Sequence, residues 1–353
     1  MEMCTFVYHF RSTPSTIYHH TLQMKLFRFL FSTALLLVAM GLGACDSTSD
    51  NTNNSPDNSG SNGEIISDAS KLSMDKTLDV VTWNLEWFGA PNKSRHASSF
   101  DQQLRAVSNR IKEIDADIYA FQELVVDDLN GNHLNDLLDE LNAEGDIWEG
   151  VYGDKYSFFF YAPSTEYPAQ RLSYVYKKST VSRVSSHSMF EDVYTGRDTY
   201  YIDDYTGYSK TFWASGRLPF MLNAEVTIAG EKIDLKLVNI HAKCCGGSST
   251  RRKADADYLK LQLDTNYDND NVIVLGDYND YISSSMDGGA SPYKSFYSNN
   301  NEKFKHVFGQ GIDHISISNE LYDEFDILSN NTTRYEDHIS DHDPHMVRFL
   351  IKD

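Results

Sequence analysis

Cysteine is scarce in this sequence, with four residues in a chain of 353. Cys4 and Cys45 lie near the amino terminus, and Cys244 and Cys245 are adjacent to each other. So few cysteines in a chain of this length exclude a fold that depends on a disulfide framework. The length suits one large domain or two ordinary ones, and a hydrophobic content of 41% suits a sizeable core.

Positive charge is also scarce, because 31 Lys and Arg residues face 51 Asp and Glu residues and leave a formal net charge of −20. This balance argues against a protein that coats nucleic acid through bulk electrostatics. An enzyme that acts on phosphates remains possible, since bound divalent cations reverse the local field. The tight basic run Arg251–Lys253 is either a contact for a polyanion backbone or, more commonly, a solvated helix face.

The apolar run Phe29–Leu42 is short for a membrane span, which needs about 20 apolar residues. With Lys25 and Arg28 before it, the run is typical of a signal peptide. The ending Leu42–Cys45 resembles a bacterial lipobox, in which the cysteine is acylated and becomes the first mature residue. An ordinary secretory signal with an incidental cysteine is the alternative.

Three segments follow from this composition: 1–45 as a signal peptide with a lipobox, 46–76 as a flexible tether, and 77–353 as a folded domain. Residues 1–23 do not fit a signal peptide, so Met24 is the expected start. The tether is rich in Ser, Asn, Asp and Thr and buries too little apolar surface to fold. The expected location is the bacterial cell envelope, with a lipid anchor at Cys45 and the outer membrane or cell surface favoured over the inner membrane.

Strands mix with helices throughout the folded domain, which predicts an α/β fold without internal repeats. The predicted helices are Phe100–Ile114, Leu134–Leu141 and Arg251–Leu263. The predicted strands are Leu78–Trp83, Asp117–Phe121, Tyr156–Tyr161, Leu172–Tyr176, Pro219–Ile228, Ile233–Ile240, a strand beginning at Val272, Ile312–Ile317 and His345–Ile351.

The stretch Val272–Asp280 is central to the functional interpretation. Its unbroken apolar run predicts a strand buried on both faces, and Asp277 and Asn279 follow at the carboxyl end. Open α/β sheets bind their ligands at that edge. Taken alone, the stretch is equally consistent with a strand that ends in a turn, because Gly, Asp and Asn are common turn residues.

Other polar residues also lie at, or just beyond, the ends of predicted strands. Loops that a rigid scaffold positions in this way commonly carry catalytic and binding residues. The full set is Asn84, Glu86, Glu123, His241, Asp277, Asn279, Asp313, Asp341 and His342.

Seven short stretches contain most of these residues and cover nearly the whole domain: Thr82–Glu86, Ala120–Glu123, Gly216–Pro219, Asn239–His241, Gly276–Asp280, Ile312–His314 and Ser340–Pro344. Through these stretches the chain resembles the endonuclease/exonuclease/phosphatase superfamily, in which the matching motifs have the same order. The superfamily includes deoxyribonuclease I-like nucleases, abasic-site endonucleases, neutral sphingomyelinases and inositol-polyphosphate phosphatases. The resemblance implies a four-layer α/β sandwich, with two mixed sheets packed face to face and helices outside.

By matched position, the resemblance makes Glu123 the principal ligand of a divalent cation, usually Mg²⁺, with Mn²⁺ or Ca²⁺ as alternatives. Glu86 and Asp341 would assist, and Asn84 would help to position the ion and a phosphate. Oxygen ligands of this kind suit Mg²⁺, which keeps several waters and binds few protein groups.

The resemblance also assigns the catalytic roles. Asp277 would orient or deprotonate the attacking water, and Asn279 would hold that water and a phosphate oxygen. His342, supported by Asp313, would contact the scissile phosphate. His241 would donate to a phosphate oxygen or to the leaving group, and Arg217 would contact the phosphate.

The resemblance has departures. Deoxyribonuclease I-like members have a glutamate that supports the histidine matched by His241, and this sequence has Gln170 or Arg171 near that place. The tryptophan- and cysteine-containing motifs of inositol phosphatases are not seen.

The implied activity is metal-dependent hydrolysis of phosphate esters by direct attack of water, with an exported DNase-like phosphodiesterase as the first hypothesis. The alternatives are a phosphoesterase on a lipid headgroup or small phosphate ester (sphingomyelinase-like or a sugar-phosphate phosphatase) and a non-catalytic binding lipoprotein. The expected partners are a phosphodiester substrate, with nucleic acid favoured, and a membrane through Cys45; the protein is expected to be a monomer.

Two further features remain open at this level. Cys244 and Cys245 lie on a loop beside the implied site, either as a strained vicinal disulfide or as free thiols. The aromatic stretch Tyr194–Trp213 is either a hairpin that packs on the sheet or a stacking surface for bases or sugars.

Overall fold

Two mixed six-stranded sheets form the centre of the domain. In the computed structural model, the described residues are 76–126, 133–157, 168–198, 212–297, 304–330 and 339–351. The first sheet has the order β11 (Phe325–Asn330), β12 (His345–Ile351), β1 (Thr77–Phe88), β2 (Ile118–Val125), β4 (Gln170–Lys177) and β3 (Trp148–Tyr152). The second has the order β5 (Val181–Ser188), β6 (Phe220–Ile228), β7 (Glu231–His241), β8 (Val272–Asp277), β10 (Asp313–Ser318) and β9 (Phe304–Gln310).

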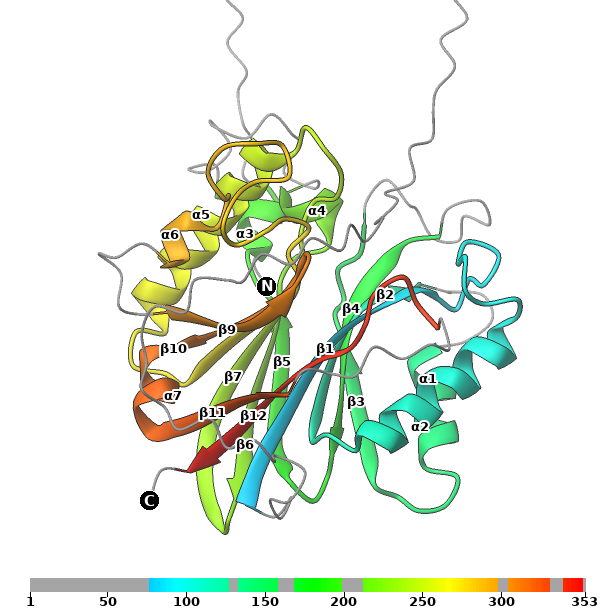
Figure 1. Ribbon diagram of the computed structural model, residues 1–353. Helices are drawn as coiled ribbons and strands as arrows, with labels where there is room; N and C mark the ends of the chain where they lie inside the picture. The colour runs from blue at the N-terminus through cyan, green and yellow to red at the C-terminus, as the bar shows by residue number, and fades with distance from the viewer. Residues whose placement is uncertain are drawn as a thin grey trace, which may run out of the picture. The chain divides into compact units, whose positions relative to one another are not determined.

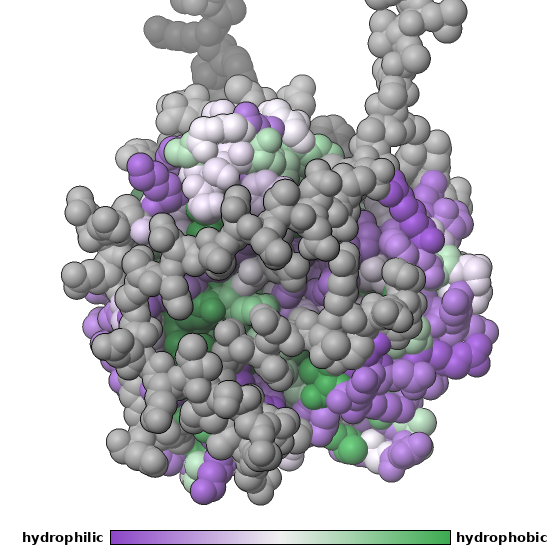
Figure 2. Space-filling view, in the orientation of Figure 1, coloured by the Kyte–Doolittle hydropathy of each residue, from purple (hydrophilic) through white to green (hydrophobic). Residues whose placement is uncertain are grey.

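Helices cover the outer faces of the two sheets (Figure 1). The first sheet is covered by α1 (Phe100–Ile114) and α2 (His133–Leu141), and the second by α5 (Ser249–Asn266) and α6 (Lys294–Tyr297). The short elements are α3 (Glu191–Tyr194), α4 (Phe212–Gly216) and α7 (Asn319–Glu324). The side of α1 that faces away from the sheet is polar, and Figure 2 shows hydrophilic residues gathered there. The arrangement confirms the predicted α/β sandwich.

Three apolar clusters fill the spaces between these layers. The central cluster lies between the sheets and includes Val80, Leu237 and Leu275. A second cluster packs the outer face of the second sheet against Leu259 and Leu263 of α5. A third packs the outer face of the first sheet against α1 and α2. Strands β1, β2, β7 and β8 therefore have apolar residues on both faces, which explains their unbroken apolar runs.

The strand directions bring one end of each central strand to the same edge of the sandwich. Strands β1 and β2 are parallel, as are β7 and β8, so their carboxyl ends lie together within each pair. Strands β10 and β12 are antiparallel to β8 and β1, so these strands begin at that edge. The polar residues that precede or follow these strands are thereby collected in one place, as the sequence pattern predicts.

A polar contact joins the two sheets beneath this edge. Gln122 Nε2 donates to Asn239 Oδ1 at 2.7 Å and to Thr82 Oγ1 at 3.1 Å. Asn239 Nδ2 donates in turn to the carbonyl oxygens of Phe121 and Ser173 at 2.9 and 3.1 Å. Both amide side chains are fully buried, so the contact holds the two sheets in one register under the site.

Replacing Gln122 with Leu is expected to lower the free energy of unfolding by about 1–3 kcal/mol, because the buried oxygen of Asn239 then loses its donor. Urea unfolding measures the change. A loss below about 0.5 kcal/mol, the range of ordinary surface substitutions, would contradict a stabilising role for this contact.

The three predicted helices and most predicted strands are confirmed, including the β6–β7 hairpin around Ala229 and Gly230. The predicted strand Tyr156–Tyr161 is not observed at Tyr156 and Ser157, and its remainder lies outside the described residues. Cys45, the segments 1–45 and 46–75 and most of the aromatic stretch, 199–211, also lie outside them. No helix in the described ranges is both long and apolar enough to cross a membrane.

Candidate active site

Asp277, at the end of β8, lies at the centre of the polar cluster. Its Oδ1 accepts a hydrogen bond from the backbone N–H of Asn279 at 2.8 Å, and its Oδ2 accepts one from Asn84 Nδ2 at 3.1 Å. His241 Nε2 is 3.4 Å from Oδ2, and His342 Nε2 is 4.0 Å away. Burial raises the pKa of Asp277 to about 7. A carboxylate with this pKa accepts a proton efficiently near neutral pH.

His342 is held against Asp313, as predicted. Its Nδ1 lies 2.6 Å from Asp313 Oδ2. Burial lowers the pKa of His342, but the Asp313 carboxylate raises it more, and the net pKa is well above the usual value. Trp83 Nε1 donates to the His342 carbonyl at 2.9 Å, and Ser340 Oγ accepts from the His342 N–H at 3.1 Å. The ring is therefore a fixed imidazolium that points its Nε2 toward Asp277.

Glu123 lies at an irregularity in β2. The pairing of β2 with both β1 and β4 shifts register here, and Glu123 has a positive φ of 65°. Such bulges re-aim a side chain at the end of a strand. Its Oε2 accepts from the Trp87 N–H at 3.0 Å, and its Oε1 lies 3.4 Å from Asn84 Nδ2 and 3.8 Å from His241 Nε2. Glu123 and Asp277 thus face each other across Asn84.

His241 is buried and differs electrostatically from His342. Burial, with the nearby Arg217 charge, lowers the pKa of His241 well below its usual value, so the ring is neutral at pH 7. Its Nδ1 has no hydrogen-bond partner among the described residues. Gln170, which occupies the region of the missing glutamate, accepts instead from Arg217 Nη1. Arg171 lies over the ring of Tyr152, 4.5 Å from its centroid.

Arg217 and Asn279 also reach this edge. Arg217 is buried, with Glu123 and Asp277 as nearby charges. Asn279 has a positive φ of 52°, and its Nδ2 donates to the Ala242 carbonyl at 3.1 Å, which ties the end of β8 to the end of β7.

A family model described as the endonuclease/exonuclease/phosphatase family matches residues 81–342, a span that contains every one of these side chains. The chain belongs to this family. Members of the endonuclease/exonuclease/phosphatase family hydrolyse phosphate esters and generally depend on a divalent metal. No curated protein sequence matches the chain.

Solved structures share the fold. An endonuclease/exonuclease/phosphatase from Beutenbergia cavernae has 15% identity and a TM-score of 0.55, over 78% of this chain and 72% of its own. The human Nocturnin catalytic domain, solved with a bound sulfate anion, has 15% identity and a TM-score of 0.51, over 78% and 95% of the two chains. A Bacteroides vulgatus family member has 14% identity and a TM-score of 0.50, over 78% and 99%.

Three carboxylates on one side of the site fit a hard divalent cation. Burial raises the pKa of Glu123, and the charge of Asp341 raises it further. Burial likewise raises the pKa of Asp341, and the charge of Glu86 adds to that shift. The three negative charges therefore repel one another. A cation would relieve this repulsion, and carboxylate oxygens are the donors that Mg²⁺ takes. Glu86 itself accepts from the Arg95 N–H and from Ser94 Oγ, each at 2.9 Å, so its carboxylate also holds the loop after β1.

A second group with metal-binding geometry consists of Asp277, Asp313 and His342, whose ligand atoms lie within 4.8 Å of one another. In this group the His342 imidazolium already supplies a positive charge between the two carboxylates. The Glu123 side also has positive groups nearby, because Arg217 acts on Glu123 and His96 Nδ1 lies 2.6 Å from Glu86 Oε2. We favour this side for the metal because it gathers three carboxylates rather than two.

Arg252 is a site residue that sequence reasoning missed, and the prediction of a solvated basic face is wrong for it. Its side chain is fully buried on α5. Nε donates to Asp280 Oδ2 at 2.9 Å, and Nη1 donates to the carbonyls of Lys243 and Cys245 at 2.9 and 3.1 Å. The solvated face does describe its neighbours, because Arg251 is half-buried and Lys253 is exposed. The acidic residue Asp280, next to Asn279, is the sequence signal that could have indicated the buried role of Arg252.

Of the two alternatives for the adjacent cysteines, the structure has thiols that no disulfide joins. Their Sγ atoms are 2.8 Å apart on the loop that follows His241.

Proposed function

We propose that this protein is a divalent-metal-dependent phosphodiesterase that uses direct attack by water, with exported nuclease action as the first assignment. One observation carries the proposal: the buried Asp277 carboxylate, with a pKa of about 7, lies between Glu123 and the Asp313–His342 pair. Family membership supports phosphate-ester hydrolysis as the reaction class.

The chemistry follows from the positions of these groups. Asp277 orients a water molecule and accepts its proton as the water oxygen forms a bond to phosphorus. The bond from phosphorus to the leaving oxygen breaks, and that oxygen takes a proton from solvent water; the proton on Asp277 returns to solvent afterwards. His342 and Arg217 offer positive charge to the phosphate oxygens, and His241 offers a neutral N–H. These donors are fixed beforehand by their buried contacts, which is what makes such stabilisation effective.

A divalent cation held by Glu123, with Asn84, Glu86 and Asp341, would add positive charge where the phosphate gathers negative charge. Mg²⁺ is the proposed ion because the donors are all oxygen atoms.

A phosphodiester in a lipid headgroup or another small ester is the second candidate, favoured by the burial of Arg252. Because Arg252 is buried, only Arg251 and Lys253 of the basic run can contact a substrate, and Lys253 pairs with Asp257 on the same helix. Affinity for a nucleic acid backbone depends on such cationic contacts.

The assay that separates the candidates uses the purified chain with plasmid DNA, RNA, sphingomyelin and bis(p-nitrophenyl) phosphate, each with Mg²⁺ and with EDTA. Cleavage of DNA or RNA that EDTA abolishes supports the nuclease assignment. Cleavage of small or lipid diesters alone would replace it with the second candidate. Activity that survives both EDTA and Asp277→Ala would refute the mechanism.

The dependence of kcat/KM on pH is expected to be bell-shaped. The rate rises through about pH 7 as Asp277 loses its proton, and it falls at higher pH as the imidazolium of His342 loses its own, because the pKa of His342 is well above the usual value. A cation near Asp277 moves the acid limb to lower pH. Rates with the small diester across pH 4 to 10 provide the measurement, and a rate that does not fall anywhere below pH 7 would contradict the role of Asp277.

We further propose that the chain is exported to a bacterial cell envelope and anchored there through acylated Cys45. Expression from Met24 with and without Cys45→Ala tests this proposal. The parent chain is expected to fractionate with membranes and incorporate labelled palmitate, and the variant to do neither. Membrane association of the variant at the parent level would refute the anchor.

A further inference from the structure

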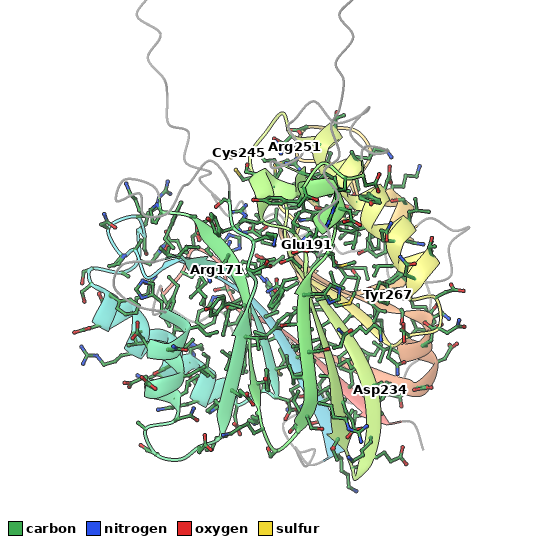
Figure 3. The ribbon with its side chains drawn as sticks, turned by 180° about the vertical axis from the view of Figure 1, so that it is seen from behind. Arg171, Glu191, Asp234, Cys245, Arg251 and Tyr267 are labelled. Carbon is green, nitrogen blue, oxygen red and sulfur yellow. The ribbon has the colours of Figure 1, made fainter. Side chains whose placement is uncertain are left out.

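The loop between β7 and α5 carries two adjacent thiols at the edge of the active site. Cys245 is exposed and Cys244 is half-buried, and their Sγ atoms are 2.8 Å apart. Figure 3 shows Cys245 beside Arg251 at one edge of the domain, far from Asp234 at the other. We propose that Cys244 and Cys245 are a thiol–disulfide modification site: they react with a low-molecular-weight disulfide such as oxidised glutathione, and the bond formed lowers the phosphodiesterase activity.

The surroundings of Cys244 favour reaction. The Nζ of Lys243 lies 3.5 Å from Cys244 Sγ. This ammonium group places positive charge where an anionic small disulfide such as oxidised glutathione would approach Cys244. The backbone at Cys245 has a φ of 75°, so the two side chains leave a turned rather than an extended backbone and meet on one side of it.

The reaction balances within the dithiol and the small disulfide. The Cys244 thiolate attacks one sulfur of the small disulfide and expels one thiolate. The Cys245 thiolate then attacks the Cys244 sulfur of the mixed disulfide and expels the second. The two cysteines lose two protons and two electrons in total; the electrons reduce the small disulfide, and the protons pass to the thiolates that leave.

A disulfide between adjacent cysteines is better suited to reversible control of activity than to permanent stabilisation of the loop. Neighbouring Cα atoms are about 3.8 Å apart across a trans peptide, below the usual disulfide range of about 4.4–6.8 Å. Strained and exposed disulfides are the more easily reduced ones. The site would therefore respond to the surrounding redox balance.

The dithiol is linked to the catalytic groups in two ways. Burial lowers the pKa of Arg217, the proposed phosphate contact, and the negative charge of Cys244 opposes that shift. The carbonyl of Cys245 accepts from Arg252 Nη1 at 3.1 Å, and the same guanidinium holds Asp280 through Nε at 2.9 Å. Asp280 follows Asn279 directly. Closing the ring constrains the backbone of Cys245 and so shifts its carbonyl, which is bound by the same guanidinium that holds Asp280.

The test treats the purified full chain with reduced or oxidised glutathione and maps the cysteines by mass spectrometry after trypsin. Cleavage after Lys243 and Arg251 places both cysteines in one peptide, Cys244–Arg251. Oxidation is expected to remove two hydrogens from this peptide without adding glutathione. Hydrolysis of bis(p-nitrophenyl) phosphate should fall by about tenfold to a hundredfold, in line with the cost of displacing catalytic groups by about 1 Å, and recover on reduction.

Cys245→Ser is the matched control: it should form only a mixed disulfide at Cys244 and should keep the parent rate under reducing conditions. Absence of the internal bond in the parent, or an internal bond that leaves the rate unchanged, would overturn the proposal. The effect on rate rests on the proposed function, but the peptide mass does not. A reduced parent that hydrolyses none of the substrates would refute the proposed function alone, while the peptide mass would still decide the modification.

Discussion

Asp277→Asn is expected to lower kcat/KM by about 10²–10⁴-fold, the contribution typical of a positioned general base. The carboxamide keeps the shape of the side chain and one acceptor oxygen for the Asn279 N–H, but it cannot accept the proton of the attacking water. The measurement is the rate with the small diester at pH 8 and saturating Mg²⁺, where the parent Asp277 is ionised.

The same substitution is expected to stabilise the fold at pH 8. Burial holds the pKa of Asp277 at about 7 in the folded protein, above the value of 3.8 for an unperturbed aspartate. As the pH rises, this carboxyl group therefore loses its proton first in the unfolded chain. The cost to the stability of the folded protein grows between about pH 4 and pH 7 and reaches its full size above pH 7. Removing the charge should raise the free energy of unfolding by about 0.5–2 kcal/mol, with little gain below pH 4.

Asp117→Asn is the matched control. Asp117 is another buried carboxylate whose pKa is raised by burial, but it lies at the opposite end of β2, where it accepts from the Asp79 N–H and from Thr180. Its substitution should leave kcat/KM within about twofold, because it touches no group of the active site. Equal losses of activity in the two variants would show that buried charge, rather than proton transfer, explains the effect of Asp277.

The central strands and the polar residues at their ends could be predicted from sequence, whereas the edge strands could not. Strands β3, β5, β9 and β11 are the four edges of the two sheets, and all four were missed. Strand β5, for example, reads Val181–Ser188 with mostly polar residues, several of them exposed. An edge strand buries little apolar surface, so it has no apolar run or clean alternation to recognise.

The site divides in the same way. Asp277, His241 and Asp313 were predictable because each directly ends or begins a buried strand, and the register then places them side by side. The contacts that fix them were not predictable, because they join residues far apart in the chain. Trp83 bonds to the backbone at His342, and Arg252 bonds to Asp280 from a helix whose sequence pattern indicates an exposed basic face. Long-range polar pairing leaves no periodic signal.

Arg252→Met is expected to lower the free energy of unfolding by about 3–5 kcal/mol, since it leaves a buried carboxylate without its counter-ion. The guanidinium and the Asp280 carboxylate are both 0% exposed, with Nη2 at 2.8 Å from Oδ2. Methionine fills much of the volume but donates no hydrogen bond, so the carbonyls of Lys243 and Cys245 also lose their partner. Urea unfolding measures the loss, and kcat/KM should fall in parallel because Asn279 precedes Asp280.

The double variant Arg252→Met, Asp280→Asn separates charge from packing. If the unpaired Asp280 carboxylate causes most of the loss of stability, the effects of the two substitutions should not add. The double variant should then be about 1–3 kcal/mol more stable than the sum of the two single-variant losses predicts. Lys253→Met is the surface control, because the neighbouring Lys253 side chain is 60% exposed and pairs with Asp257; it should change stability by less than about 0.5 kcal/mol. Strict additivity in the double variant would mean that Arg252 acts through its shape and its carbonyl contacts, and that the ion pair with Asp280 contributes little of its own.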